Sequence, residues 1–584
     1  MDNPQLDWRF REKDEEKIRT FSAELNLPYN ITSLLVQRGI DTPKSIQAFL
    51  YPKLSHLPSP FLMKGMGKTC EILESTIAAK SPIAIFGDYD CDGITSTALL
   101  SIFFTQLGLQ VFNYLPNRLS NGYGLNKEGV QHLFEKCKKS GEGKPLLITV
   151  DCGISDFDVV DFAMDLGFSV IVTDHHRPSD LLPNADAVLN PLQKGCDYPF
   201  KSLAGVGVAF CLLMAVRQRL HENGYWNGNR QQVPNLKEYL DLVTIGTIAD
   251  MVPLTGPNRI MVKAGLEVLS QTERAGLKYL LEKTVNIPAN VTAEDVAFQI
   301  SPRINAMGRL GEPSASLELL LTDDKKEVFR LIELLELTNN KRKILGQTVY
   351  EQAEKLAEQA VKSGNKSLIL YDPEWHTGVV GIAAARIVRQ FHRPTILLTM
   401  KDGEIRGSGR SVDGINIHEA LIDCGHCLNR FGGHRAAAGL SLNKEKLSEF
   451  SLLFEETVKN ILSDEMVRPV LWIDQEIGFQ ELFSEEFLNY YQMLHPFGQG
   501  NSEPVFLHNS LKVVHTKKVG KESLRFTVLE NDRYCDGFGF GYGALGELLQ
   551  NKCSAIAFYL RLNTFRGNRK WEIRAEAFRH GPTP

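Results

Sequence analysis

Three aspartates spaced two residues apart form the densest group of chemically active side chains in the sequence. Asp88, Asp90 and Asp92 follow the apolar stretch PIAIF (82–86) and precede an apolar, helix-like stretch that begins at Gly93. Carboxylates this close repel one another unless a cation or several hydrogen-bond donors lie among them. A strand that ends in acids and turns into a helix places oxygen ligands at the carboxyl edge of a parallel sheet, where open α/β folds bind ligands.

The same spacing also begins a calcium-binding EF-hand loop, but the sequence disfavours this alternative. An EF-hand requires a bidentate Glu at the twelfth position of its loop, and Leu99 stands at that position counted from Asp88. The segment before Asp88 is strand-like, whereas an EF-hand begins with a helix. We therefore expect a different kind of cation site.

Further candidate ligands follow the next strand-like segments and one helix-like run: Asp151, Asp174, His175, His176 and Asp250. Sites rich in oxygen, with one or two histidines and no thiolate, favour Mn²⁺ or Mg²⁺ over zinc. Four or more carboxylates exceed what one hard cation usually takes from a protein. Two ions that share a bridging carboxylate would use them all, and such pairs support an in-line displacement at phosphorus.

Each of these residues also has a structural alternative. A single Asp after a strand is usually a helix N-cap or a turn former. Asp174 fits that role, or the role of a partner that fixes an imidazole tautomer. Adjacent histidines on an extended strand point in different directions, so we expect His175 to bind metal and His176 to contact phosphate. The complete set at successive strand ends favours a site.

The composition is that of a large globular protein. The chain has 584 residues, of which 43% are hydrophobic and 23% are charged, enough for about three or four domains. No apolar run approaches the roughly 18–20 residues of a membrane span. The N-terminal stretch has no signal-peptide pattern. Ten scattered cysteines suggest reduced thiols, so we expect a cytoplasmic location.

One cysteine pair requires separate consideration. Cys424 and Cys427 form a CGHC motif with the spacing of thiol oxidoreductases. That motif normally follows a strand, whereas here it follows NIHEALID (416–423), which has a helical pattern. A zinc knuckle would need a second pair of cysteines at similar spacing, and the sequence has none. Redox function therefore remains a weak alternative.

The order of apolar segments predicts a doubly wound, mostly parallel α/β fold. Strand-like segments occur at 82–86, 145–150, 168–173 and 185–190, separated by helical stretches. A long proline-free stretch has helical periodicity and predicts one long helix, or two.

We expect a helical lead (1–60), an α/β catalytic domain (61–325), a connecting long helix (326–365), a smaller α/β domain (366–465) and a β-rich end (466–584). A DNA-binding helix-turn-helix is an alternative for the lead, although a packing appendage is favoured.

The β-rich end is the most basic part of the chain. Residues 511–584 contain 13 Lys and Arg against 7 Asp and Glu, a local charge of +6 in a chain of net charge −5. This imbalance permits a polyanionic partner. A small barrel fits the pattern, and Phe526, Phe565 and Trp571 would suit a surface that grips a single strand. Barrel cores use the same residue types.

These residues together resemble a known family. The motifs DYDCDG, TVDCGIS, DHH and ADMVPL, in this order, are similar to those of the DHH phosphoesterase superfamily. The RecJ branch is indicated by LPNRLSNGYGLN, SPRINAMGRLGEPSAS, EWHTGVVGIAAARI, RGSGRS, RFGGHRAAAGL and PFGQGNSEPVF. The resemblance covers nearly the whole chain. It implies a catalytic DHH domain, a DHH-associated substrate-binding domain that closes over it, and an OB-fold-like end.

The resemblance also implies an activity. RecJ enzymes are single-strand-specific DNA exonucleases that work 5′ to 3′ with Mg²⁺ or Mn²⁺ and release 5′-mononucleotides. It further implies roles in recombination and repair, a monomer at the bacterial nucleoid, and contact with single-strand-binding protein and a helicase.

The family's functional residues carry over onto this sequence. Its metal ligands fall on Asp88, Asp90, Asp92, Asp151, His175 and Asp250. Its phosphate and substrate contacts fall on Arg118, Tyr123, His176, Arg303, Asn305, Arg309, Ser408, Arg410 and His434. Arginine forks suit phosphate oxygens, and glycine-flanked loops allow close approach of the backbone to a polyanion. Tyr123 could stack on a base or belong to the core.

Three positions depart from the family pattern. Cys91 and Cys152 stand beside proposed ligands where relatives often carry a small residue or Asn, so oxidation or capture of a softer metal could inhibit the enzyme. Arg177 follows DHH where an acidic residue is common, and it would contact phosphate or face solvent. None of these departures removes a proposed ligand.

Two further alternatives remain beside the exonuclease. One is another DHH enzyme, acting on pyrophosphate, short oligoribonucleotides or cyclic dinucleotides; such chains are usually shorter and lack the β-rich end. The other is a non-catalytic DNA-binding scaffold that has lost its ligands, which the complete ligand set disfavours.

Overall fold

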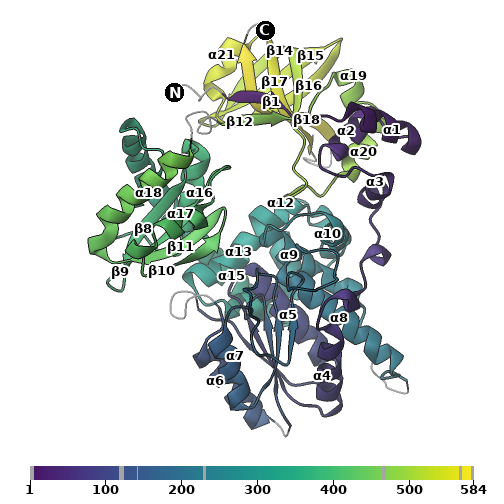
Figure 1. The fold of residues 1–584 in the computed structure, drawn as a ribbon. Coiled ribbons are helices and arrows are strands. Elements are labelled where there is room, and N and C mark those ends of the chain that lie inside the picture. Colours follow the sequence, from purple (N-terminus) through teal and green to yellow (C-terminus); the bar gives the residue numbers. More distant parts are fainter. Residues whose placement is uncertain are drawn as a thin grey trace. The chain divides into compact units, whose positions relative to one another are not determined.

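The computed structural model describes residues 6–117, 124–140, 143–227, 232–462, 469–563 and 569–580. The chain forms two compact units (Figure 1). Among the described residues, one unit comprises Pro58–Asp250 and Gly265–Pro469, and the other comprises Leu6–Leu57, Met251–Ala264 and Val470–Pro584. Across these described ranges, no helix combines the length and the apolar character needed to cross a bilayer.

The first unit contains a five-stranded sheet in the order β3-β2-β4-β5-β6, in which all neighbouring strands are parallel. Its strands are β2 (Ile83–Gly87), β3 (Val111–Tyr114), β4 (Leu146–Val150), β5 (Ser169–Thr173) and β6 (Ala187–Leu189). β2 and β4 are completely buried, as expected for a parallel sheet covered on both faces. The predicted doubly wound α/β fold is therefore confirmed, with β3 as a strand that the sequence pattern did not indicate.

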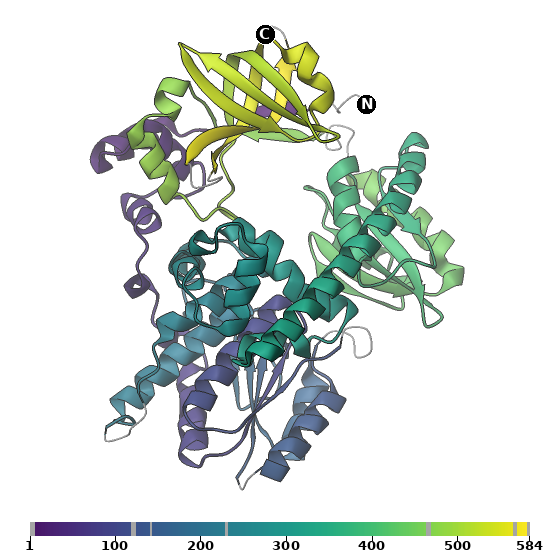
Figure 2. The same ribbon diagram turned by 180° about the vertical axis from the view of Figure 1, so that it is seen from behind.

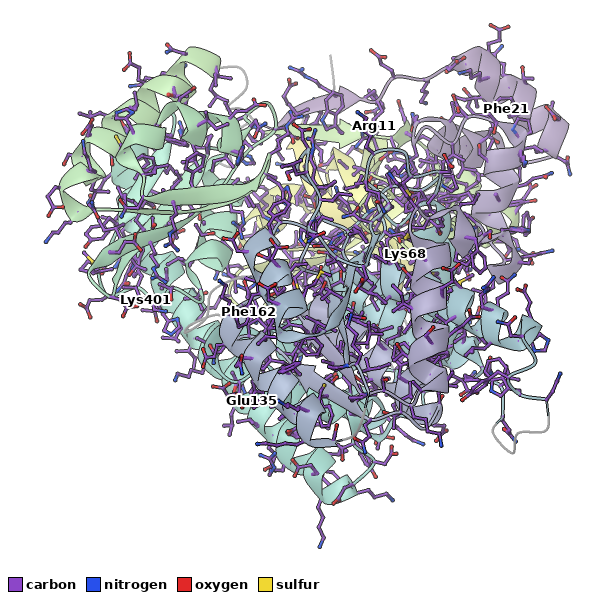
Figure 3. The ribbon with its side chains drawn as sticks, turned by 60° about the horizontal axis from the view of Figure 1, so that its bottom comes forward. Arg11, Phe21, Lys68, Glu135, Phe162 and Lys401 are labelled. Atoms are coloured by element: carbon purple, nitrogen blue, oxygen red, sulfur yellow. The ribbon has the colours of Figure 1, made fainter. Side chains whose placement is uncertain are left out.

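Helices cover this sheet on both faces (Figure 1). They are α4 (Met66–Ala78), α5 (Cys91–Gln106), α6 (Lys127–Ser140), α7 (Phe157–Leu166) and α8 (Gly205–Glu222). α6 and α7, which carry the labelled residues Glu135 and Phe162 in Figure 3, bury one face together with β2, β4 and β5. α5 and α8 are buried along most of their length, so the loops at the carboxyl edge are held by rigid elements.

A helical layer leads from this sheet to a single long helix. It contains α9 (Leu240–Ala249), α11 (Ala275–Thr284), α12 (Ala293–Asp295), α13 (Ser301–Leu310) and α14 (Ser314–Leu321), together with the end of α10 (Gly256–Leu269), which begins in the second unit. The predicted long helix is one continuous element, α15 (Lys325–Lys362), of 38 residues (Figure 2). It contacts α13 at one end and α16 at the other.

The second sheet of this unit has the order β10-β11-β9-β8-β7. Its strands are β7 (Leu368–Tyr371), β8 (Thr395–Lys401), β9 (Glu404–Arg410), β10 (Arg430–His434) and β11 (Ala437–Leu442). Only the β7–β8 pair is parallel within this sheet. The helices α16 (Val380–Phe391), α17 (Ile417–Asp423) and α18 (Leu447–Ile461) bury its faces.

The second unit is built on a closed β-barrel, which confirms the expected barrel. Its five strands are β14 (Phe506–Val519), β15 (Ser523–Glu530), β16 (Arg533–Gly539), β17 (Cys553–Asn563) and β18 (Lys570–His580). β14 pairs with both β15 and β17, and this double pairing closes the barrel. The short β13 (Gln475–Glu476) adds to β14.

The N-terminal segment belongs to this barrel unit. The helices α1 (Glu15–Leu25), α2 (Tyr29–Val36), α3 (Pro43–Leu50), α19 (Phe479–Leu482) and α20 (Glu485–Met493) accompany it, and residues of α2, α3 and α20 share the barrel's apolar core. Residues 1–60 were expected to be a helical lead, yet they also contribute β1 (Asp7–Phe10), which pairs in parallel with β12 (Val470–Ile473).

The expected strand-gripping aromatic surface is wrong for Phe526. Its side chain is 1% exposed and belongs to the barrel core. Trp571 is partly buried and packs edge-on against Tyr491, with ring centroids 5.9 Å apart, whereas Phe565 lies outside the described residues. Alternation along a barrel strand shows which residues share a face, but it does not show which face is inward.

Candidate active site

The carboxyl ends of β2, β4 and β5 bring the predicted ligands together. Asp88 follows β2, Asp151 follows β4, and His175 lies just beyond β5. Because β4 lies between β2 and β5 in the sheet, these three chain ends meet at one edge. Asp250 reaches the same place as the C-cap residue of α9.

Backbone N–H groups fix two of the aspartates. Asp90 is the N-cap of α5, and its Oδ1 accepts hydrogen bonds from the N–H groups of Asp92 (2.9 Å) and Gly93 (3.1 Å). The carboxylate of Asp92 accepts from the N–H groups of Gly205 (2.6 Å) and Val206 (2.8 Å), at the start of α8. A helix N-terminus stabilises a carboxylate, so Asp92 is held rigidly although it is buried.

Asp151 has a left-handed backbone, with φ of 60°. This conformation is uncommon for a residue with a side chain, although Asp and Asn adopt it more readily than most. The N–H of Asp151 donates to the carbonyl of Thr173 at the end of β5 (3.1 Å). The turn directs the carboxylate toward His175, whose Nε2 lies 3.1 Å from Asp151 Oδ1.

The two histidines have different surroundings. His175 Nε2 lies 3.6 Å from Asp250 Oδ2 and 3.9 Å from Asp92 Oδ2, so it belongs among the proposed ligands. His176 Nδ1 instead lies 2.8 Å from Asp174 Oδ1. Asp174 Oδ1 also accepts from the N–H groups of His175 (2.7 Å) and His176 (3.0 Å), so Asp174 both forms the turn and fixes the imidazole orientation of His176.

The electrostatics of the site are dominated by burial and by repulsion between carboxylates. Burial, followed by the charge of Asp90, raises the pKa of Asp92 to about 7. Burial and the neighbouring carboxylates likewise raise the pKa of Asp250 to about 9. Burial lowers the pKa of His175 to about 4. For His176, burial is outweighed by the hydrogen bond to Asp174 and its charge, and the pKa rises to about 9.

The donor set fits divalent cations. Three groups have ligand atoms within 4.8 Å of one another: Asp88 with Asp90 and Asp151, Asp92 with His175 and Asp250, and Asp151 with His175 and His176. Within the described residues, the buried atoms Asp151 Oδ1, His175 Nε2 and Asp250 Oδ2 have no hydrogen-bond partner. Buried polar atoms without partners are costly. A cation coordinated by these atoms would remove that cost.

A pH dependence of stability follows from these pKa values. In chelator-treated protein, Asp92, Asp250 and His176 have folded pKa values of about 7, 9 and 9, above their unfolded values. Their contribution to stability is therefore lost as pH rises through the folded pKa. We expect the chelated protein to lose on the order of 2 kcal/mol between pH 7 and pH 9, measured by urea unfolding.

The control for this prediction is Mn²⁺. Because cations bind deprotonated ligands, Mn²⁺ should raise the melting temperature more at pH 9 than at pH 7. Asp250→Asn should flatten the pH dependence in chelator, since it removes one titrating group with a raised pKa. A chelated protein that is more stable at pH 9 than at pH 7 would contradict the assignment.

A basic pocket lies in the second sheet of the same unit. It has a volume of about 430 Å³ and is lined by the predicted Ser408 and Arg410, together with Lys401 and Arg406, which the sequence reasoning missed. Lys401 ends β8 (Figure 3). The start of α16 also lines the pocket, so its backbone dipole and these cations suit an anion.

Other predicted contacts have more specific surroundings. His434, on β10, lies parallel to His176, with ring centroids 6.4 Å apart. Asn305 accepts a hydrogen bond from the N–H of Cys91 (2.8 Å) and so braces the start of α5. Arg303 is buried and pairs with Glu336 of α15 (2.5 Å).

Arg309 is on α13, and its guanidinium donates to the carbonyl of Gly378 (3.4 Å), two residues before α16. Arg118 and Tyr123 lie outside the described residues. The roles of these residues in substrate binding stay predictions.

Two glycines were missed by the sequence reasoning. A Cβ atom at Gly205 would lie 2.8 Å from the Cβ of Asp151, and one at Gly246 would lie 3.0 Å from Asp92 Oδ1. α8 and α9 can approach the carboxylates only because these positions lack a side chain. In the sequence these glycines stand in the stretches AGVGVAF and TIGTIAD. Glycines in such apolar stretches usually indicate close packing between helices, so the stretches did not point to the site.

The three departures from the family pattern leave the site intact. Cys91 and Cys152 are buried, and burial raises the pKa of both thiols well above the usual range. A protonated, buried thiol reacts slowly, which disfavours the expected sensitivity to oxidation. Arg177 is exposed. The redox alternative is disfavoured too, because burial raises the pKa of Cys424 to about 12.

Comparison with family models matches three segments of the chain. Residues 82–247 match the DHH family, N-terminal domain; residues 364–460 match the DHHA1 domain; and residues 473–577 match the RecJ OB domain.

Curated relatives match over nearly the whole length. The single-stranded-DNA-specific exonuclease RecJ of Dickeya dadantii is 37% identical over 95% of this chain and 97% of its own. The Bacillus subtilis RecJ is 34% identical over 97% of this chain and 70% of its own. The crystal structure of Thermus thermophilus RecJ in complex with Mn²⁺ superposes with a TM-score of 0.82 at 30% identity, covering 100% of this chain and 81% of that one. With its sheet-edge cluster, its associated domain and its barrel, the chain belongs to the RecJ family of DHH proteins.

Proposed function

We propose that this protein is a single-stranded-DNA-specific exonuclease that hydrolyses phosphodiester bonds 5′ to 3′ and releases 5′-mononucleotides. Its relatives at 34–37% identity are named single-stranded-DNA-specific exonucleases. The proposal makes the chain a metal-dependent hydrolase, in line with Thermus thermophilus RecJ structures in complex with Mn²⁺ and with Mg²⁺.

The observation that carries the proposal is the sharing of Asp151. This residue belongs to the ligand group with Asp88 and Asp90, and its Oδ1 lies 3.1 Å from Nε2 of His175, which belongs to the group with Asp92 and Asp250. A carboxylate between two ligand groups can bridge a pair of divalent ions, as a two-metal site would use it. The all-oxygen group and the mixed oxygen and imidazole group both suit Mn²⁺ or Mg²⁺, which agrees with the expected cofactors.

The chain's own residues supply the rest of the chemistry. Bound divalent ions would activate a water molecule and offset phosphate charge, held by Asp88, Asp90, Asp92, Asp151, His175 and Asp250. The hydrogen bond to Asp174 and its charge raise the pKa of His176 to about 9 against the effect of burial, which favours the protonated ring. With Nδ1 held by Asp174, Nε2 can donate a proton to a hydrogen bond with a phosphate oxygen.

The basic pocket would bind a second phosphate of the same strand. Arg410 donates to Ser408 Oγ (3.0 Å), which orders both side chains. Because the pocket and His434 belong to neighbouring strands of one sheet, a strand reaching His176 would place another phosphate near it. We infer that this contact holds the 5′ end and thereby sets the polarity.

The wider biology is part of the same proposal. A single-strand exonuclease of this family would act in DNA recombination and repair, in the bacterial cytoplasm at the nucleoid. It would work as a monomer beside single-strand-binding protein and a helicase. The barrel would contact the strand, as the basic charge of residues 511–584 suggests.

The test is digestion of one oligonucleotide labelled at either end, with Mn²⁺, Mg²⁺ or EDTA. The 5′-labelled strand should release labelled mononucleotide from the first time point, whereas the 3′-labelled strand should shorten progressively. EDTA should stop both reactions. A duplex and a short RNA of the same sequence serve as controls and should be cut slowly. Digestion in EDTA, or first release of the 3′ label, would contradict the proposal.

A further inference from the structure

A second cluster of metal-ligating side chains lies away from the acidic site. His426 and Cys427 belong to the 3₁₀ turn η6 (Gly425–Cys427), and Glu449 lies on α18. One ligand atom of each lies within 4.8 Å of the others. η6 is the CGHC motif, which the nuclease function does not use.

The three side chains differ in exposure. Cys427 is 2% exposed, whereas the side chains of His426 and Glu449 are 61% and 48% exposed. His426 Nε2 lies 3.3 Å from Glu449 Oε1, and Lys446 Nζ lies 2.7 Å from Glu449 Oε2. The carboxylate is therefore already oriented toward the turn, with its other oxygen turned to a lysine.

The position of Cys427 is fixed by the turn. Its N–H donates to the carbonyl of Cys424 (3.0 Å), so the thiol cannot move far from His426. The other thiol of the motif is engaged elsewhere, because Cys424 is hydrogen-bonded to Thr457. The motif therefore offers one thiol and one imidazole, and Glu449 of α18 supplies a third ligand.

We propose that His426, Cys427 and Glu449 form a second metal site, which takes Zn²⁺ or a cation of similar softness. An imidazole, a thiolate and a carboxylate are all zinc ligands, and three protein ligands with water in the fourth position make a common zinc geometry. The acidic site has no such thiolate and suits harder ions. Binding replaces the thiol proton with the metal and releases that proton to solvent.

The competing interactions at the cluster are weak. The ion pair between Lys446 and Glu449 is exposed, and exposed pairs contribute little to stability. Charge pairing accounts for His426 and Glu449, and the Cys427 thiol hydrogen-bonds to Glu449, but a thiol is a weak donor. Metal binding uses all three side chains.

The site would also have a structural consequence. η6 directly precedes β10, which carries Gly433 of the basic pocket and His434 beside His176. A cation held between η6 and α18 would anchor the start of that strand. The inference does not depend on the nuclease proposal, because its test measures metal binding and not activity.

The experiment uses Co²⁺ as a spectroscopic probe on the full chain. Saturating Mn²⁺ first occupies the acidic site, and Co²⁺ is then titrated while the near-ultraviolet thiolate-to-Co²⁺ charge-transfer band is followed. We expect a band that saturates at one equivalent and disappears on addition of Zn²⁺. Cys427→Ser should lose the band, whereas Cys553→Ser, a change at an exposed cysteine, should keep it.

Two further variants keep the test independent of folding. His426→Ala and Glu449→Gln change exposed side chains, so both should fold, and each should weaken Co²⁺ binding at least about tenfold. The proposal is overturned if the wild-type chain gives no band, if Cys427→Ser keeps the wild-type band, or if both surface variants bind Co²⁺ as tightly as the wild type.

Discussion

Asp151→Asn should lower the rate of single-stranded DNA hydrolysis by roughly 10³-fold or more, because it removes the shared ligand. Losing several kcal/mol of transition-state stabilisation corresponds to about tenfold in rate for each 1.36 kcal/mol. Asparagine has nearly the same shape and tolerates the left-handed backbone of this position, with its φ of 60°. The variant should therefore fold, which Asp151→Ala does not guarantee.

The measurement separates catalysis from binding. Single-turnover digestion with Mn²⁺ gives the rate, and fluorescence anisotropy with a labelled strand gives the affinity, which should stay within about tenfold of the wild type because the basic pocket is unchanged. Asp161→Asn changes an exposed aspartate of α7 and serves as the matched control. Hydrolysis by Asp151→Asn at the wild-type rate would reject the site.

The sequence could predict the acidic site because its geometry follows from topology. Parallel strands end at one edge of a sheet, so Asp88, Asp151 and His175 had to meet once the alternating pattern was recognised. Asp250 follows a helix-like run and not a strand, so the topology of the sheet alone did not place it at this edge.

Other features depend on pairings between distant residues, which one sequence does not reveal. Arg303 was expected to contact phosphate, yet it also pairs with Glu336, 33 residues later on α15. Glu449 completes the cluster around CGHC from a different helix. In each case the side chain's surroundings are set by tertiary packing and not by local pattern.

Arg259 is the clearest example of a residue whose surroundings the sequence could not predict. An arginine in an amphipathic helix normally lies at the surface, whereas Arg259 of α10 is 1% exposed. Its guanidinium donates to five backbone carbonyls of the second unit: Phe49 (3.0 Å), Met493 (2.7 Å), Leu494 (3.1 Å), His495 (2.9 Å) and Pro496 (3.5 Å). It also lies 3.7 Å from the centroid of the Phe49 ring.

Two of these carbonyls, those of Phe49 and Met493, belong to the ends of helices, and the other three follow directly after α20. α3 ends at Leu50 and α20 ends at Met493, and the last carbonyls of a helix have no partner within it. Arg259 supplies the donors and a positive charge, which a helix C-terminus favours. One side chain thus joins the N-terminal segment, α10 and the segment that leads into the barrel.

Arg259→Met should therefore destabilise the second unit by about 4 kcal/mol, because methionine fills the space but leaves buried carbonyls without donors. The midpoint of the urea transition followed by tryptophan fluorescence should fall by about 1–2 M.

Lys263→Met is the matched control. Lys263 lies one turn along α10 and reaches Leu50 and Met493 only at 3.5 and 3.4 Å, so its loss should cost about 1 kcal/mol. Stabilisation by Mn²⁺ should persist in both variants, because the ligands belong to the first unit. Equal midpoints for Arg259→Met and the wild type would show that these carbonyls find other donors and that the arginine does not hold the three segments together.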